Sequence, residues 1–343
     1  MHKYTAQDWI QPHINVRSRK GAPLQGNFPC RGYAYIIGGV TSLSMLDGFS
    51  LRRKYLVGVS GGCDSMVLLD ALRVQGFDRL VVCHFNHGLR PREARQEAQL
   101  VARAARGVTL EYGEANTAEY ARSQRVSVEM AARDLRFRFF ETCAAAHRCQ
   151  RIFLGHHADD QVETMLLNLF RGTGLAGLAG MKPEARVGRL EVLRPFLGLS
   201  RESIREYAVQ NRVAFAEDAS NASRDYTRNR IRHDLMPHIK RIFPAASDAL
   251  LRLAGIVREE EDFLASETPV FGERISVKEL RGLAAALRAR AVLRWLRDRG
   301  VRDPGFAETV AVLSLLDVEN GPAKVNLPAG LHARRSRGEI FID

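Results

Sequence analysis

The chain has 343 residues, 45% of them apolar and 26% charged, the composition of an ordinary globular protein with room for two domains. Its apolar runs fall short of the roughly 20 residues that a membrane-spanning helix needs, so we expect no membrane association. The five cysteines include no C-x-x-C pair, which argues against a zinc ribbon or a disulfide framework and favours a reducing, cytoplasmic location.

The chain is strongly basic, with a net charge of +12 and a pI of about 9.9. Lys and Arg side chains that neutralise phosphates supply most of the non-specific affinity of proteins for nucleic acids, so a polyanionic partner is the first interpretation. The alternative is compositional, because nearly all of the basic residues are Arg, and such a bias can follow codon usage alone. The charge by itself leaves both interpretations open.

Residues 1–44 differ in composition from the rest of the chain, since they are rich in Gly and Pro and Asp8 is their one acidic residue. Their apolar stretch comes late and is broken by Gly38 and Gly39, unlike that of a secretory signal. Two interpretations compete: a disordered extension, and an over-long start with Met45 as the true first residue. A transit peptide is a third interpretation of this segment.

The first two thirds of the chain alternate short apolar runs with segments of helical periodicity. Strands are predicted at Tyr55–Ser60, Arg79–His84, Val108–Leu110, Ile152–Gly155 and Val192–Leu193. Helices are predicted at Met66–Val74, Glu93–Ala105, Val128–Ala146 and Asp159–Phe170, and from the N-cap residue Ser200 to about Gln210. This alternation indicates an α/β fold with a doubly wound parallel sheet, whose ligands bind beyond the carboxyl ends of the strands.

From about residue 242 the strand signal fades. Helical periodicity at Ala246–Ala265, Leu287–Arg299 and Phe306–Leu316 predicts a smaller, mainly helical domain, with short β segments near Lys324–Leu327 and Glu339–Ile342. We therefore expect an extension at 1–44, an α/β domain at 45–240 and a second, accessory domain at 241–343.

The strongest chemical signal lies between the first strand and the first helix and reads Ser60, Gly61, Gly62, Cys63, Asp64, Ser65. Glycines let a phosphate approach the backbone, and a helix N-terminus offers free N–H groups. The two serine hydroxyls can donate further hydrogen bonds, whereas Asp64 would repel a phosphate and is therefore expected to hold Mg²⁺ against it. The motif is not the Walker pattern. The structural alternative is a simple glycine turn before a helix.

This SGG-x-DS motif after a strand resembles the pyrophosphate loop of the PP-loop, or N-type, ATP pyrophosphatases, a Rossmann-like class that adenylates a substrate oxygen. Later motifs narrow the resemblance. They are, in chain order, His84–Arg90, Gly155–Thr164, Arg171–Gly174, Arg194–Phe196, Asp218–Asn221 and Tyr226–Arg232. In this order they resemble the tRNA(Ile)-lysidine synthetase family over roughly residues 55–237.

The resemblance implies a ligase that uses ATP with Mg²⁺, L-lysine and the tRNA(Ile) that carries a CAU anticodon. In the implied reaction, O2 of the wobble cytidine attacks the α-phosphate of ATP and releases pyrophosphate. The lysine amine then displaces AMP from C2, and the resulting lysidine pairs with A instead of G. The resemblance also implies that 45–240 is the catalytic PP-loop domain and that 241–343 is a tRNA-binding or accessory domain, and it suggests a homodimer.

The resemblance further implies roles for particular residues. ATP is expected to lie against the pyrophosphate loop, His84, Arg171 and Gly172. Asp160 and Glu163, spaced i, i+3 on one helix face, can hold the lysine ammonium and accept its protons, and Arg136 can pair with a carboxylate. Asp64, Asp160 and Glu163 are the expected catalytic residues. In the alternative, the two acids only complement the helix dipole and Arg136 is a solvated side chain.

The stretch 224–241 is basic, and aromatic rings interleave with its charges. Such a stretch suits an RNA backbone, so binding of tRNA is expected at Arg224, Arg228, Arg230 and Arg232. The alternative is a solvated basic helix, or arginines that serve the structure near the ATP site. The adjacent His156 and His157 lack the spacing of a zinc site and are expected to hydrogen-bond near ATP.

Two other functions stay open. A PP-loop tRNA thiolation enzyme would need a reactive pair of cysteines, but Cys143 and Cys149 are six residues apart, which is not a face-sharing helical step. A non-catalytic tRNA-binding homologue would be expected to lose first the residues that only catalysis requires. Ser60, Asp64 and Glu163 are all present. Both observations favour the ligase.

Overall fold

The structure is a computed structural model in which residues 46–89, 91–217 and 227–343 are described. The expectations for residues 1–44 fall outside these ranges. Within them, no helix is both long enough and apolar enough to cross a membrane.

A six-stranded sheet with the order β3-β2-β1-β4-β6-β5 forms the centre of the α/β part. Its strands are β1 (Tyr55–Gly58), β2 (Leu80–Asn86), β3 (Thr109–Glu114), β4 (Arg151–Phe153), β5 (Glu184–Val187) and β6 (Leu190–Leu193). The first four strands and β6 pair in parallel, whereas β5 pairs antiparallel with β6 at the edge. The predicted α/β fold with a parallel sheet is confirmed. The edge strand was not predicted, because its alternately exposed, polar residues give no apolar run.

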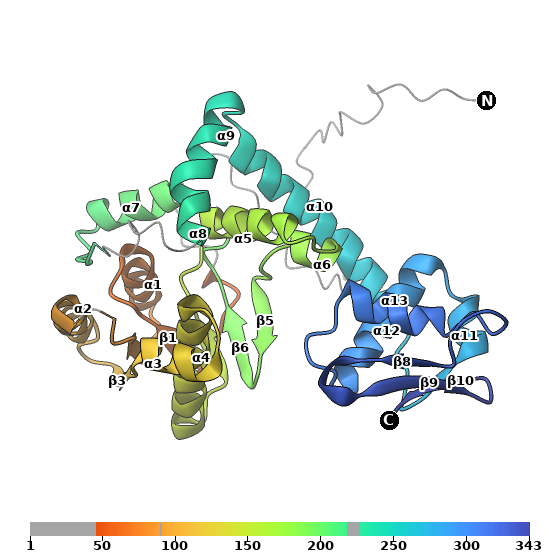
Figure 1. Ribbon diagram of the computed structural model, residues 1–343. Coiled ribbons are helices and arrows are strands. Elements are labelled where there is room, and N and C mark those ends of the chain that lie inside the picture. The colour runs from red at the N-terminus through yellow and green to blue at the C-terminus, as the bar shows by residue number, and fades with distance from the viewer. Residues whose placement is uncertain (1–45, 90, 218–226) are drawn as a thin grey trace, which may run out of the picture. The chain divides into compact units, whose positions relative to one another are not determined.

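Helices cover both faces of this sheet (Figure 1). They are α1 (Cys63–Val74), α2 (Pro91–Ala104), α3 (Thr117–Gln124), α4 (Val128–His147), α5 (Ala158–Phe170), α6 (Leu175–Leu178) and α7 (Arg201–Gln210). Because strand side chains alternate, Tyr55 and Val57 pack with α1, α2 and α7, while Leu56 packs with α4 on the other face. The sheet is therefore doubly wound, as predicted.

The loops that follow β1 and β4 lie in contact at the carboxyl edge of the sheet. A Cβ atom on Gly155 would come within 3.0 Å of the backbone oxygen of Asp64. A side chain here would press on the backbone of Asp64, so Gly155 favours the close approach of the histidine motif after β4 to the phosphate loop after β1.

A helical segment lies against α5. It consists of α8 (Thr227–Arg230), the π-helical turn η3 (Ile231–Leu235), α9 (Met236–Ile242) and the long α10 (Ala246–Glu267). Ile231 and Met236 are buried in an apolar cluster with Val162 and Leu166 of α5. This cluster fixes the 227–236 segment beside the N-terminal half of α5.

The C-terminal part has its own core around Trp295, which is 1% exposed and donates to the Gly272 carbonyl. It contains α11 (Val277–Gly282), α12 (Ala285–Asp298), α13 (Phe306–Ser314), the short η4 (Pro328–Gly330), β7 (Ile275–Ser276), β8 (Lys324–Asn326), β9 (His332–Ser336) and β10 (Glu339–Ile342). The strands form an antiparallel sheet with the order β7-β10-β9-β8. The three expected helices are present as α10, α12 and α13, and the two expected β segments as β8 and β10, whereas α11 was not predicted. The sheet is larger than expected, because the basic sequence of β9 gives no strand signal.

Candidate ATP and substrate site

The phosphate loop is braced by its own serines. Ser65 Oγ donates to the Gly62 carbonyl at 3.0 Å and accepts from the Ser60 amide at 3.1 Å, and Ser60 Oγ accepts from the Gly62 amide at 3.3 Å. Gly61 has a φ of +97°, which favours glycine. The loop is thereby held open at the start of α1, where Gly62 is the N-cap and makes no side-chain cap. This is the geometry of an anion site at a helix N-terminus.

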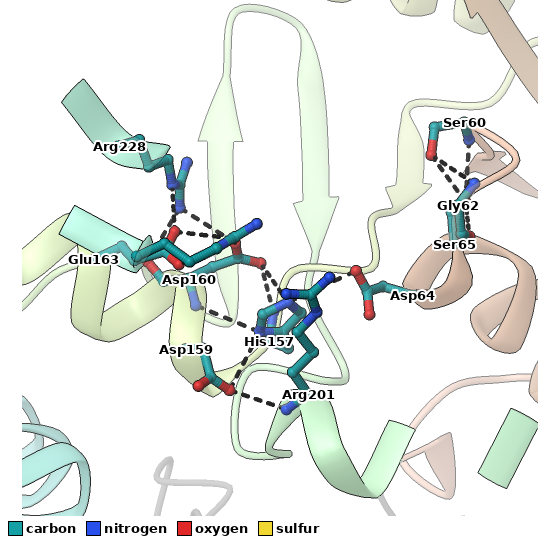
Figure 2. Close-up of polar contacts among 11 residues, drawn as sticks. Ser60, Gly62, Asp64, Ser65, His157, Asp159, Asp160, Glu163, Arg201 and Arg228 are labelled. Carbon is teal, nitrogen blue, oxygen red and sulfur yellow. Dashed lines mark hydrogen bonds and ion pairs between the residues drawn. The ribbon is translucent and has the colours of Figure 1, made fainter. Parts of the chain in front are cut away.

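Asp64 lies in the first turn of α1 and has one buried oxygen, Oδ1, with no hydrogen-bond partner in the described part of the chain. Burial raises the pKa of this carboxyl, and Asp160 adds to the effect, while His157 and the Arg201 guanidinium act against it. Figure 2 shows the Arg201 guanidinium directed at Asp64. A divalent cation would supply the positive charge that the buried oxygen lacks.

His157 connects Asp64 to helix α5. It is the N-cap of α5: its Nδ1 accepts from the Asp160 amide at 3.4 Å, and its own amide donates to Asp160 Oδ2 at 3.0 Å. An accepting Nδ1 leaves the proton of the neutral ring on Nε2. That nitrogen lies 3.6 Å from Asp64 Oδ2 and 3.5 Å from Asp160 Oδ2 (Figure 2). Sequence reasoning expected a hydrogen-bonding histidine here but not one shared by two carboxylates.

Asp160 and Glu163 both point from α5 toward the 227–235 segment, where two arginines meet them. Arg232 Nε donates to Glu163 Oε1 at 2.5 Å, and Arg228 Nε donates to Glu163 Oε2 at 2.9 Å. Burial disfavours the charged form of Asp160, but His157 and Arg228 outweigh it and lower the pKa of this carboxyl. The carboxylates thus share one helix face, as the i, i+3 spacing predicts.

This arrangement departs from the expectation that Arg228 and Arg232 lie on an RNA backbone. Their side chains are only 29% and 18% exposed and are turned to carboxylates inside the protein. The reason is tertiary: the Ile231 cluster turns this side of the segment inward. Arg230 is exposed, and its role in tRNA binding stays a prediction. Arg224 lies outside the described residues.

Arg136 lies on α4 among positive and neutral groups. Burial lowers its pKa to about 10, and the neighbouring Arg133 and Arg228 add to the effect. Its Nε is buried and has no hydrogen-bond partner among the residues that the structure describes. Burial and Arg136 together lower the pKa of His87 to about 4, so that imidazole is neutral at pH 7. An uncompensated guanidinium of this kind suits a carboxylate ligand.

The remaining residues expected at the ATP site divide into two groups. His84 is 2% exposed and lies beside the loop, with Nδ1 2.8 Å from the Val59 carbonyl. Its Nε2 is buried and has no partner within 46–89, 91–217 and 227–343. Because a carbonyl only accepts, the proton is on Nδ1, and Nε2 is an acceptor. Arg171 and Gly172, by contrast, follow the C-terminal end of α5 and are exposed. Arg171 is roughly 16 Å farther along the helix axis than Asp160. The structure does not bring these two residues to the phosphate loop.

The four cysteines in the described ranges lack the character of sulfur-transfer residues. Burial, together with Asp64, raises the pKa of the Cys63 thiol to about 11, so it is protonated at neutral pH. Cys83, Cys143 and Cys149 are buried in the apolar cluster between the sheet and α4. A buried thiol is a poor nucleophile, which does not favour thiolation chemistry.

A cavity of about 820 Å³ borders this site. Asp159 and Arg201, which lie beside His157 and Asp64 (Figure 2), form part of its wall, and Arg205 and Lys240 also line it. The Arg201 amide donates to Asp159 Oδ2 at 2.9 Å, which ties the start of α7 to the start of α5. The cavity is of the size that accommodates a nucleotide or an amino acid.

Comparisons with known proteins agree with this site. Residues 41–239 match the PP-loop domain, and residues 275–341 match the TilS substrate binding domain. The tRNA(Ile)-lysidine synthase of Solibacter usitatus is 35% identical over 310 residues, which cover 84% of this chain and 67% of that protein. That of Bacillus subtilis is 38% identical over 217 residues, covering 62% and 46%, and that of Bacillus licheniformis is 33% identical over 308 residues, covering 84% and 64%. The chain spans about half to two thirds of the length of these relatives.

The PP-loop match alone covers more than half of the chain, and the second match falls in the C-terminal part that follows it. The order of the motifs, the parallel sheet and the braced phosphate loop agree with these matches. The chain belongs to the tRNA(Ile)-lysidine synthase family of PP-loop proteins.

Proposed function

We propose that this protein ligates lysine to C2 of the wobble cytidine in a tRNA(Ile) with a CAU anticodon, using ATP. The observation that supports it most directly is the buried, unpartnered Oδ1 of Asp64 at the start of α1, beside a braced phosphate loop. A carboxylate in that place would repel a bare phosphate, but it can bind a cation that is bound to the phosphate. A cytoplasmic location, where tRNA is modified, is part of the proposal.

The residues present fit Mg²⁺. In the described ranges, no group of three or more His, Cys, Asp or Glu side chains is placed to hold a metal alone. This agrees with Mg²⁺, which proteins commonly bind through one or two carboxylates together with substrate phosphates. Asp64 would hold the ion, which would neutralise charge on the phosphates that leave as pyrophosphate.

In the first half-reaction, a bond forms between O2 of the cytidine and the α-phosphorus, and the bond from that phosphorus to the β-phosphate oxygen breaks. The Cys63 amide at the start of α1 would bind the pyrophosphate portion, and Nε2 of His84 would accept a hydrogen bond from the adenosine. Arg201, directed at Asp64, would hold the carboxylate beside the phosphates.

In the second half-reaction, the lysine nitrogen forms a bond to C2, the bond from C2 to O2 breaks, and AMP leaves with that oxygen. The nitrogen must lose a proton first, because only a neutral amine is a nucleophile. Arg136 would hold the lysine carboxylate, and Asp160, kept ionised by His157 and Arg228, would orient the ammonium and accept the proton that it loses.

The test is incubation of the full chain with ATP, Mg²⁺, labelled lysine and a CAU-anticodon tRNA transcript. Pyrophosphate release and lysine incorporation should occur in equal amounts, and a transcript with U in place of the wobble C should support neither. Incorporation of sulfur from a persulfide donor, or tRNA binding without pyrophosphate release, would support a rival function and overturn this one. Light scattering would test the homodimer.

A further inference from the structure

An exposed aromatic side chain lies beside His84 at the carboxyl end of the sheet. Tyr112 of β3 is 48% exposed, and its ring centroid is 5.8 Å from that of His84, with an angle of 38° between the two ring planes. The two residues are register partners in parallel strands, so their side chains leave the sheet on the same face. This is the face on which Val82 packs with α1. Because the phosphate loop leads into α1, the Tyr112 ring and the loop share one side of the sheet.

The Tyr112 ring is held in place through the hydroxyl group at its tip. Asn86 Nδ2 donates to Tyr112 Oη at 3.2 Å, and Tyr112 Oη donates to Glu114 Oε2 at 3.0 Å. Asn86 is itself fixed, because its Oδ1 accepts from the Gly88 amide at 2.9 Å. A side chain that is oriented before its ligand arrives loses little conformational freedom on binding. Such a ring is suited to a nucleobase, since every base has a π face that can stack on it.

His84 supplies a polar group next to this ring. The residue is 2% exposed, and burial lowers the pKa of the imidazole, so the ring is neutral. Its Nδ1 carries the proton and faces the Val59 carbonyl, which leaves Nε2 as an acceptor. This Nε2 is buried, and no residue in the described parts of the chain donates to it. A buried acceptor without a donor costs free energy, so a ligand that brings an N–H group would bind favourably here.

The order of the strands puts both side chains within reach of a nucleotide on the phosphate loop. Val59 directly precedes the loop, β2 is adjacent to β1, and β3 is adjacent to β2. Neighbouring strands lie about 4.8 Å apart, so β3 is about 10 Å from β1 across the sheet. A nucleotide whose phosphates lie on the loop can extend its base over this distance.

We infer that Tyr112 is a further binding residue for ATP: its ring stacks on the adenine, while His84 Nε2 accepts a hydrogen bond from the 6-amino group of the base. The inference rests on the use of ATP in the proposed function, and it assigns a residue that none of the sequence motifs contains. Guanine carries an oxygen in place of the 6-amino group and offers no donor at that position. The two residues together therefore select adenine nucleotides over guanine nucleotides.

The experiment measures the dissociation constant for ATP with Mg²⁺ by calorimetry on the full chain, without tRNA, so that no adenylation occurs. Tyr112→Leu removes the ring and should raise this constant by about fivefold or more, as expected for the loss of one stacked base. Tyr112→Phe keeps the ring and should bind ATP more tightly than Tyr112→Leu. An unchanged dissociation constant in Tyr112→Leu would overturn the inference. Weaker tRNA binding in that variant, with unchanged ATP binding, would show that the ring contacts RNA instead.

A matched control lies on the same strand. Leu110 is two residues before Tyr112, on the same face of β3, and is 37% exposed. Leu110→Ala also shortens an exposed side chain of β3, but nearer to the start of the strand, so the dissociation constant for ATP should stay at the wild-type value. Equal weakening in Leu110→Ala and Tyr112→Leu would show that Tyr112 acts only through the strand, which contradicts the inference.

The contact with His84 is tested with altered nucleotides, so no variant of this buried histidine is needed. Purine riboside triphosphate lacks the 6-amino group, and GTP has an oxygen there. Both should bind the wild-type protein about tenfold more weakly than ATP, because the hydrogen bond to the buried Nε2 is not made. Tyr112→Leu should weaken ATP and purine riboside triphosphate by the same factor, since stacking does not depend on the 6-amino group.

Equal affinities of ATP and purine riboside triphosphate for the wild-type protein would overturn the assignment of His84 to the 6-amino group. None of these measurements uses lysine or tRNA, so they are independent of lysidine formation. If the wild-type protein binds ATP through Tyr112 but transfers no lysine to tRNA, the proposed function fails while the adenine contact stands.

Discussion

His157 Nε2 lies 3.6 Å from Asp64 Oδ2, so the N-cap of α5 contacts the carboxylate of the phosphate loop in α1. The two residues come from loops after β1 and β4, which are adjacent strands of the sheet. Because the same ring also accepts from the Asp160 amide, it cannot turn without breaking the cap of α5. The position of Asp64 is therefore coupled to the start of the helix that carries Asp160 and Glu163.

Asp64→Asn should abolish adenylation while the fold survives. The amide has nearly the same shape, but it cannot neutralise a divalent cation, so we expect pyrophosphate release to fall by at least about 100-fold, as for loss of one essential electrostatic group. Single-turnover pyrophosphate release with Mg²⁺ present is the measurement. Asp298→Asn, on the exposed end of α12, is the control. Pyrophosphate release at the wild-type rate in Asp64→Asn would show that Asp64 does not hold the metal ion.

Arg136→Gln should weaken lysine binding without slowing pyrophosphate release. A lost charge-assisted hydrogen bond is typically about 1.5–3 kcal/mol, so the half-saturating lysine concentration should rise by roughly ten- to a hundredfold. The thermal midpoint should rise slightly at the same time, because an uncompensated buried charge is removed. Arg138→Gln, two residues on and 64% exposed, is the control. Unchanged lysine dependence would place the lysine carboxylate elsewhere.

Stability should decrease as the pH falls from about 6.5 toward 4, and His87 should contribute to the decrease. Its pKa in the folded protein is about 4, below the ordinary 6.5, so in this window the unfolded chain binds a proton that the folded chain does not. Each such proton changes the free energy of unfolding by up to about 1.4 kcal/mol per pH unit. Denaturant unfolding across this range should show a shallower pH dependence in His87→Gln. An unchanged dependence would mean that His87 is protonated in the folded protein.

Binding of tRNA should weaken steeply with salt, and Arg230 should contribute to the slope. The logarithm of affinity falls by about 0.7–0.9 per phosphate contact for each unit in the logarithm of salt, so Arg230→Gln should make the slope shallower by about one unit at most. Arg228→Gln should leave the slope unchanged, since its guanidinium is bonded to Glu163. Filter binding at several salt concentrations makes the comparison. A shallower slope for Arg228→Gln alone would mean that RNA draws Arg228 away from Glu163.

The sequence by itself determined the elements whose signal is local. Alternating apolar runs predict the parallel strands, and the SGG-x-DS motif between strand and helix predicts a phosphate loop, because both depend only on neighbouring residues. The i, i+3 spacing of Asp160 and Glu163 likewise places them on one helix face before any contact is known. The strands β5 and β9 were missed, since each mixes charged residues with few apolar ones and gives no apolar run.

Only the tertiary structure decided what the charged side chains meet. The sequence of a basic stretch such as 224–241 does not distinguish arginines that face RNA from arginines that face carboxylates inside the protein. Burial of Ile231 against Val162 and Leu166 turns Arg228 and Arg232 inward, onto acids more than 60 residues away in the chain. Likewise, Arg171 follows α5 in sequence but lies at the far end of that helix from the phosphate loop. The charge of a side chain follows from the residue type alone. The group that this side chain contacts depends on packing between segments that are distant in the chain, and no local sequence pattern records that packing.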